Sequence, residues 1–179
     1  RDAEATFTLY KMQREELTHI PEELIDNEMD LVKAVYAMEK RGVRISTTYC
    51  QAAMEYDTAR ITEIKKQISV LTKREYKSGP LWLSEVMLEY GVSLIENEKG
   101  NYVLDKKALK GYGNEIADLI LELRALEKRV SSFWSSLLNE SDKDGYIHAN
   151  FKINGTDTGR FSCENPNLQQ LPKEDKLGF

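Results

Sequence analysis

NEIADLILELRALEKRVSSFWSSLL, residues 114–138, carries the pattern that decides the fold. Its apolar side chains recur at three- and four-residue steps, which places them along one face of a helix. Residues 48–74 show a similar pattern, typical of a coiled-coil-like seam, so the two segments are predicted to pair as long antiparallel helices. The stripes consist of Ile116, Leu119, Ile120, Leu123, Leu126, Val130, Phe133 and Leu137 in the first segment and of Met54, Ile61, Ile64, Ile68 and Leu71 in the second.

Two shorter helices are predicted between the long ones, over residues 83–90 and 105–110. Asp105 can cap the second of them, and glycines end both. Together they would form a small tip on the helical hairpin, which makes the predicted fold mainly α. The terminating glycines are Gly91 for the first helix and Gly111 or Gly113 for the second.

Two further helices are expected before the hairpin. The first runs from Asp2, which can cap it, to about residue 17, and the second from about residue 26 to Arg41, where Gly42 stops it. Residues 43–45 then form a short extended piece, and Ser46 or Thr47 caps the next helix. The expected apolar sides are Phe7, Leu9, Tyr10 and Met12 in the first helix and Met29, Val32, Val35, Tyr36 and Met38 in the second.

The composition changes after residue 138. Residues 139–145 are a polar loop, and residues 146–153 alternate in polarity as a strand does. Residues 154–172 are rich in Gly, Thr, Ser, Asn and Pro without periodicity, which predicts an extended loop. We call residues 154–172 the TGR loop, after Thr158-Gly159-Arg160.

The bulk composition limits the function classes. Apolar residues make up 41% and charged residues 31%, a balance that fits a soluble protein rich in helix. The net charge of −5 points away from nucleic-acid binding unless Lys and Arg are clustered. No apolar run could span a bilayer and the first residues lack a signal-peptide pattern, so we expect a cytoplasmic protein with no membrane partner. Cys50 and Cys163 are expected to be reduced thiols.

The TGR loop holds the most specific chemistry. Arg160 lies beside Gly159, which permits close backbone approach, and Asn167 and Gln169 carry amides that both donate and accept hydrogen bonds. Minor-groove acceptors look nearly alike in every correct base pair, so such a set would test pairing geometry without reading sequence. The alternative is that Arg160 is a surface residue and that the two amides satisfy turn backbone.

This loop resembles the TGR…PNLQ motif that opens the palm of family A DNA polymerases, the bacterial polymerase I group. Gln170-Leu171 departs from the Asn-Ile frequent in the family, without removing a required donor type. The resemblance extends over most of the chain in the expected order. Further similar segments are residues 29–45 (the helix entering the polymerase region), 78–91 (a thumb segment), 121–128 (the helix returning from the thumb) and 145–148 (the strand before the loop).

The resemblance implies an organisation and a set of DNA contacts. Residues 1–22 would be the last helix of a 3′-5′ exonuclease-like domain, 23–45 the helix and strand entering the palm, 46–140 the helical thumb and 141–179 the start of an α+β palm. Primer-template duplex would be bound by Arg124 and Lys128, four residues apart on one helix face, and by Thr158, Arg160, Asn167 and Gln169. Arg124 and Lys128 could instead pair with Glu127 or other carboxylates on a solvated face.

The resemblance also implies what this chain does not contain. The metal-binding aspartates of the family follow the TGR loop, so we expect no catalytic residue here, and Mg²⁺ and dNTP would bind only in the intact parent. Asp2 matches a metal-binding Asp of the exonuclease, but the other carboxylates of that site are absent and Asp2 can serve as a helix cap. The parent would be a DNA-directed DNA polymerase of bacterial, phage or organellar origin, and the chain a monomer.

A second reading needs no resemblance. The two long stripes could form a non-enzymatic helical-hairpin module that binds protein, with the acidic charge keeping it soluble. Periodicity alone is compatible with both readings. The TGR loop together with Arg124 and Lys128 favours the polymerase, because a protein-binding hairpin has no need of groove-reading groups.

Overall fold

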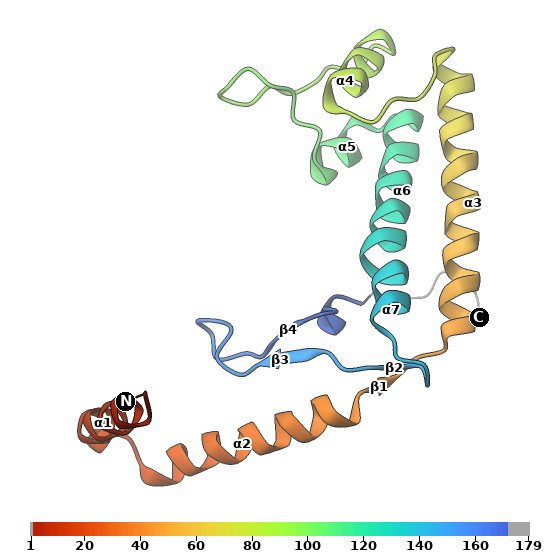
Figure 1. The fold of residues 1–179 in the computed structure, drawn as a ribbon. Helices are drawn as coiled ribbons and strands as arrows, with labels where there is room; N and C mark the ends of the chain where they lie inside the picture. The colour runs from red at the N-terminus through yellow and green to blue at the C-terminus, as the bar shows by residue number, and fades with distance from the viewer. Residues whose placement is uncertain (1, 172–179) are drawn as a thin grey trace. The chain divides into compact units, whose positions relative to one another are not determined.

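The computed structural model describes residues 2–171 (Figure 1). These residues divide into two compact units. One unit combines the chain up to Val43 with His148–Gln170, and the other is Arg44–Ile147. We refer to them as the N-terminal unit and the hairpin unit, and each is described by itself. The predicted divisions at residues 22, 45 and 140 stay predictions, and Arg1 and residues 172–179 lie outside the described residues.

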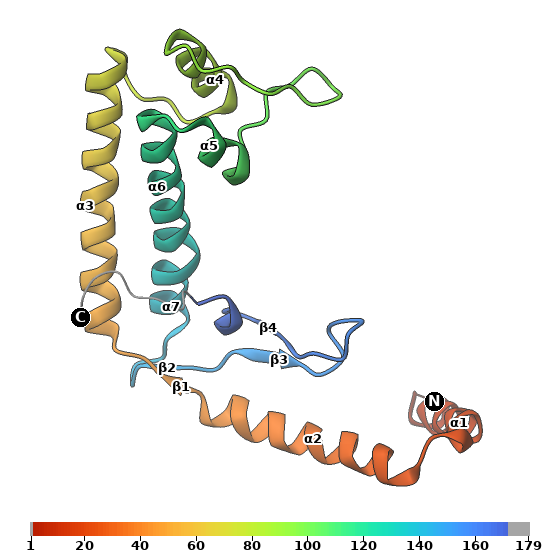
Figure 2. The same cartoon turned by 180° about the vertical axis from the view of Figure 1, so that it is seen from behind.

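The hairpin unit is built on two long helices that run side by side (Figures 1 and 2). Helix α3 (Thr47–Thr72) begins where the Ser46 hydroxyl accepts a hydrogen bond from the Tyr49 amide. Its partner α6 (Glu115–Arg129) begins at Asn114, whose side chain accepts from the Ile116 amide. The long antiparallel pair predicted from the stripes is therefore present. The second helix continues without a gap from α6 through a π-helical segment η2 (Val130–Trp134) into α7 (Ser135–Glu140).

Two short helices form the tip of the hairpin, as predicted. Helix α4 (Pro80–Glu89) starts three residues earlier than expected, because Pro80 fits the first helical turn. Helix α5 (Lys106–Tyr112) is capped by Asp105, whose carboxylate accepts from the Ala108 amide at 2.8 Å, and it ends at Gly113 rather than Gly111.

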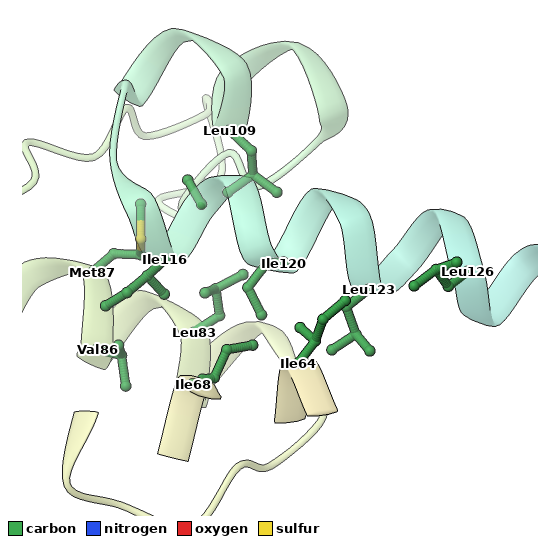
Figure 3. Packing of buried hydrophobic residues seen from close by; sticks show 11 residues of the cluster. Ile64, Ile68, Leu83, Val86, Met87, Leu109, Ile116, Ile120, Leu123 and Leu126 are labelled. Atoms are coloured by element: carbon green, nitrogen blue, oxygen red, sulfur yellow. The ribbon is translucent and has the colours of Figure 1, made fainter. Parts of the chain in front are cut away.

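The core of the hairpin unit lies where α3, α4, α5 and α6 meet (Figure 3). Met87 from α4 and Leu109 from α5 are fully buried against the stripes of the long helices. The tip therefore closes the apolar seam at one end of the hairpin. The cluster comprises Ile64, Ile68, Leu83, Val86, Met87, Leu109, Ile116, Ala117, Ile120, Leu123 and Leu126.

The strand predicted over residues 146–153 is wrong as a single element. The structure has two strands there, β2 (Tyr146–Ile147) and β3 (Asn150–Lys152). Strand β2 pairs with β1 (Val43–Arg44), and β3 pairs with β4 (Ser162–Glu164). Polarity alternates through both strands, so the pattern could not reveal that they have different partners.

The N-terminal unit contains α1 (Asp2–Glu16), the 3₁₀ turn η1 (Leu17–His19) and α2 (Glu22–Arg41). Helix α2 begins about four residues before the predicted start and ends at Gly42 as expected. The apolar sides expected of both helices are largely uncovered, since α1 buries no residue and α2 buries only Val35. Their exposed members are Phe7, Leu9, Tyr10, Met12, Met29, Val32, Tyr36 and Met38.

The TGR loop is more regular than predicted. It contains β4 and the 3₁₀ turn η3 (Leu168–Gln170), because backbone groups of β4 pair with β3 in the register Phe151 opposite Cys163. Its predicted last residue, 172, lies outside the described residues. The fold class is mainly helical, as predicted, and the strands form small antiparallel pairs instead of the single short strand expected. Among residues 2–171, no helix is both long and apolar enough to cross a membrane.

Candidate nucleic-acid interface

A buried ionic network fixes the two long helices where α6 ends. Asp57 of α3 has no exposed surface, and its carboxylate accepts hydrogen bonds from Arg129 Nε at 2.6 Å, from Arg129 Nη2 and from Trp134 Nε1 at 2.8 Å. Hydrogen bonding to Asp57 raises the pKa of Arg129 above its ordinary value. Residues five apart are neighbours in a π turn, so η2 brings Arg129 and Trp134 to the same carboxylate.

Helix α6 presents the two cations predicted to grip DNA. Arg124 and Lys128 are both exposed. The Arg124 guanidinium donates to the Leu104 carbonyl at 2.6 Å, which ties it to the tip. Glu127 forms its ion pair with Lys65 of α3 at 2.7 Å. Within residues 2–171, neither Arg124 nor Lys128 forms an ion pair.

Besides Arg129, three other cations of the hairpin unit, Arg60, Lys65 and Arg74, are engaged in ion pairs. Arg60 bridges Glu122 at 2.8 Å and Glu63 at 3.3 Å, and the hydrogen bond to Glu122 raises its pKa. Arg74 pairs with Glu89 at 2.5 Å. These pairs connect elements within the unit, so Arg60, Lys65 and Arg74 are less available to phosphate than Lys128.

A small cavity of about 160 Å³ lies beside Arg124 in the tip. Tyr76 and Trp82 line it and stack edge to face, with ring centroids 5.3 Å apart. Burial raises the pKa of the Tyr76 hydroxyl. Arg124 lines this cavity as well, and the hydrogen bond to the Leu104 carbonyl restrains its guanidinium.

The TGR loop holds Arg160 by its backbone. The Thr156 side-chain oxygen accepts from the Arg160 amide at 3.0 Å and donates to the Arg160 carbonyl at 2.8 Å. The Gly159 amide donates to the Thr156 carbonyl at 3.2 Å, and Gly159 has a φ of 71°, which favours glycine. The Arg160 side chain is exposed, and no described residue pairs with its guanidinium.

The two loop amides satisfy backbone groups of their own loop. Asn167 Oδ1 accepts from the Gln169 amide at 3.1 Å, and Gln169 Nε2 donates to the Phe161 carbonyl at 3.0 Å. This is the alternative considered from the sequence. Both side chains remain exposed, with donor or acceptor groups still open. Their contact with DNA stays a prediction.

Helix α2 supports the strand that leads into the TGR loop. Glu39 Oε1 accepts from the Phe151 amide of β3 at 2.7 Å, and the Glu39 carbonyl lies 2.8 Å from His148 Nδ1. A groove of about 620 Å³ lies beside this contact, lined by apolar and polar residues of α2 and of residues 150–154, among them Tyr36 and Phe151. The sequence pattern gave no sign of the Glu39 contact, because it joins residues 112 positions apart.

The described residues do not fit a metal site. Residues 2–171 contain no group of three or more His, Cys, Asp or Glu side chains that could hold an ion. Asp2 is an exposed residue at the start of α1, where its carbonyl accepts from the Thr6 hydroxyl at 2.9 Å. One carboxylate does not hold Mg²⁺ without further oxygen ligands.

The predicted DNA contacts thus fall into two groups. Arg124 and Lys128 share one face of α6 in the hairpin unit, whereas Thr158, Arg160, Asn167 and Gln169 lie together in the TGR loop of the N-terminal unit. Sequence reasoning missed Thr156 and Glu39, which hold the loop and its strand. A Thr four residues before the loop Arg is a weak signal, because Thr is common in turns.

Comparison with known proteins identifies the family. The protein-family model described as DNA polymerase family A matches residues 46–179, and the chain belongs to this family. DNA polymerase I of Helicobacter pylori is 31% identical over 156 residues, which are 86% of this chain and 17% of the relative. The DNA-directed DNA polymerase of Pseudomonas phage M6 is 28% identical over 168 residues, 85% of this chain and 25% of the relative. The chain therefore spans a quarter or less of these two relatives.

A solved structure shares the fold. The POL domain of Pol1 from M. smegmatis, in complex with DNA primer-template and dNTP, matches with a TM-score of 0.72 and 21% identity. The match covers 80% of this chain and 26% of that one. At this identity the likeness bears on the fold, and it supports the mainly helical assignment.

Proposed function

We propose that this chain is the part of a DNA-directed DNA polymerase that holds primer-template duplex. The hairpin unit acts as the thumb, in which Lys128 contacts the phosphate backbone. The TGR loop contacts the minor groove through Arg160. The observation that carries the proposal is the Arg160 guanidinium, which is exposed and unpaired among residues 2–171 while its backbone is tied in place.

The chemistry of the loop supports a sequence-tolerant contact. The minor groove presents purine N3 and pyrimidine O2 acceptors in similar positions for every correct pair. A guanidinium donates to such acceptors without selecting a base, as a replicating enzyme requires. Thr158, Asn167 and Gln169 lie in the same loop and would add hydroxyl and amide contacts after a small reorientation.

The cations of α6 support a backbone contact. Lys128 is exposed and free of ion pairs in the described part of the chain, and Glu127 beside it is neutralised by Lys65. An unpaired Lys can release a counterion from DNA, whereas a paired one must first lose its partner. Arg124 contributes a second positive charge one turn away, held by the Leu104 carbonyl.

Nucleotide transfer is proposed to occur elsewhere in the complete polymerase. Residues 2–171 offer no multi-carboxylate site, so Mg²⁺ and dNTP would bind to other parts, and this chain alone would be inactive. The proposed role of Asp2 is to contribute to an exonuclease metal site only in such a complete protein. We also propose that the chain is monomeric and that its parent acts in the cytoplasm of a bacterial or phage-infected cell, as the bacterial and phage relatives suggest.

The proposed phosphate contact of Lys128 is tested by fluorescence anisotropy. A labelled primer-template duplex is titrated with the chain at several salt concentrations. Lys128→Ala should weaken binding and lower the salt slope by about one, because one phosphate contact is lost. Lys66→Ala on α3 is the matched control, since Lys66 is also exposed and lies outside the proposed interface. Absence of binding at low salt, or equal losses from the two substitutions, would contradict the proposal.

A further inference from the structure

Thr156 makes more hydrogen bonds than its position in a surface loop requires. Its side-chain oxygen is bonded to both backbone groups of Arg160, and it also lies 3.3 Å from the Thr158 hydroxyl oxygen. A hydroxyl has one proton to donate and two lone pairs that accept. The proton of Thr156 goes to the Arg160 carbonyl, so Thr158 must be the donor in the third bond. The Thr156 hydroxyl is therefore saturated.

These bonds constrain the backbone of one residue and leave its side chain unpaired. With both its amide and its carbonyl bonded to Thr156, Arg160 cannot rotate its peptide groups without breaking a bond. The turn between them is closed by the Gly159 amide on the Thr156 carbonyl. The other end of the turn is packed, since a Cβ on Gly155 would lie 3.0 Å from Ser162 Cβ and 3.1 Å from Lys152 Cβ.

We propose that Thr156 is a positioning residue that presents Arg160 to the DNA minor groove. Because the loop is already ordered, binding does not have to supply the entropy cost of ordering the Arg160 backbone. Thr158 assists by donating to Thr156, which gives it a role inside the loop besides any DNA contact. The inference rests on the proposed function, because it assumes that Arg160 contacts the duplex.

Two substitutions at one position separate the hydroxyl from the shape of the side chain. Thr156→Val keeps the branched shape and removes all three hydrogen bonds, whereas Thr156→Ser keeps the hydroxyl and removes only a methyl group. Thr62→Val on α3 is the control, because the Thr62 hydroxyl is also exposed and bonded to backbone, at the Thr58 carbonyl. All variants are made in the 179-residue chain.

Hydrogen exchange of the Arg160 amide, measured by NMR without DNA, is the first readout. Loss of one or both hydrogen bonds between Thr156 and the Arg160 backbone, at roughly fivefold each, predicts a roughly five- to twenty-five-fold faster exchange in Thr156→Val. Thr156→Ser should restore protection, and Thr62→Val should leave it unchanged. An Arg160 amide that already exchanges like an unfolded peptide in the unmodified chain, or that is unaffected by Thr156→Val, overturns the proposal.

Duplex affinity at fixed salt is the second readout, with Arg160→Ala as the reference. We expect Thr156→Val to weaken binding up to the loss seen in Arg160→Ala, Thr156→Ser to restore it, and the double variant Thr156→Val/Arg160→Ala to bind like Arg160→Ala alone. If Arg160→Ala weakens binding and Thr156→Val does not, positioning by Thr156 is wrong while the Arg160 contact stands. If Arg160→Ala has no effect, the proposed groove contact itself fails and the positioning role fails with it.

Discussion

Asp57→Ala should strongly destabilise the hairpin unit. The substitution leaves the Arg129 guanidinium, whose side chain is 19% exposed, without its buried partner, and it leaves the Trp134 ring N–H without an acceptor. Deleting one partner of a buried pair costs about 3–5 kcal/mol, and partial access of Arg129 to water favours the lower end. The Trp134 ring N–H left without an acceptor costs about 1 kcal/mol more, so the free energy of unfolding should fall by about 4 kcal/mol in total.

Urea unfolding followed by tryptophan fluorescence measures this loss selectively. The chain has 2 tryptophans, Trp82 and Trp134, and both lie in the hairpin unit. With a slope of about 1.5 kcal/mol per molar urea, a loss of about 4 kcal/mol lowers the midpoint by about 2.7 M. Glu63→Ala, on the same helix, removes an exposed pair and should cost less than about 1 kcal/mol.

A second variant keeps the prediction testable if Asp57→Ala fails to fold. Asp57→Ala/Arg129→Leu removes both charges, so no ion is left buried without a partner, and it should be more stable than Asp57→Ala alone. A midpoint for Asp57→Ala within about 0.5 M of the unmodified chain would refute the reasoning, since about 0.5 M corresponds to less than 1 kcal/mol at this slope. Additive losses in the double variant would refute it as well.

Three further predictions concern both units. Gly155→Ala should destabilise the β3–β4 hairpin by about 1–3 kcal/mol, because its Cβ would meet Ser162, and faster amide exchange in the hairpin would show this; unchanged exchange would contradict it. Glu39→Ala should speed exchange of the Phe151 amide and Glu39→Gln should do so less, because Gln keeps an acceptor; equal rates in the two would argue against a bond through the carboxylate. Burial raises the pKa of the Cys50 thiol. The contribution of this thiol to the free energy of unfolding is therefore complete below the ordinary thiol pKa, and it is lost as pH rises through the pKa of the thiol in the folded state. The free energy of unfolding, followed by fluorescence, should therefore fall above about pH 8.5, and it should fall less in Cys50→Ala than in the unmodified chain. Identical pH profiles in the two proteins would show that Cys50 does not cause the fall.

Periodicity predicted the hairpin unit well because its helices bury their own stripes. Ile64 and Leu123 recur at helical spacing and are fully buried, and the caps Ser46 and Asp105 are confirmed by their hydrogen bonds. The same method predicted the helix α1 correctly, but the apolar side chains of that helix, such as Phe7, are exposed among the described residues. A periodic stripe indicates that a face can be buried, and it does not say by what.

Long-range contacts were beyond prediction from spacing. Asp57 and Arg129 are 72 positions apart, and nothing in either local sequence indicates that they pair. The residues of the TGR loop were singled out by their chemistry and by a resemblance to a known family, and the sequence could not show that Gln169 bonds to the Phe161 carbonyl. Such contacts depend on the folded backbone, which local patterns do not determine.

Mapping of amide chemical shifts during titration with primer-template duplex tests the central claim most directly. If the chain holds duplex as proposed, shifts should concentrate in the TGR loop around Arg160 and on α6 around Lys128, and they should diminish as salt is raised. The absence of shifts at low salt would contradict the account. Shifts confined to the groove between α3 and α6 that Val70 and Leu119 line would instead favour a helical-hairpin interaction module.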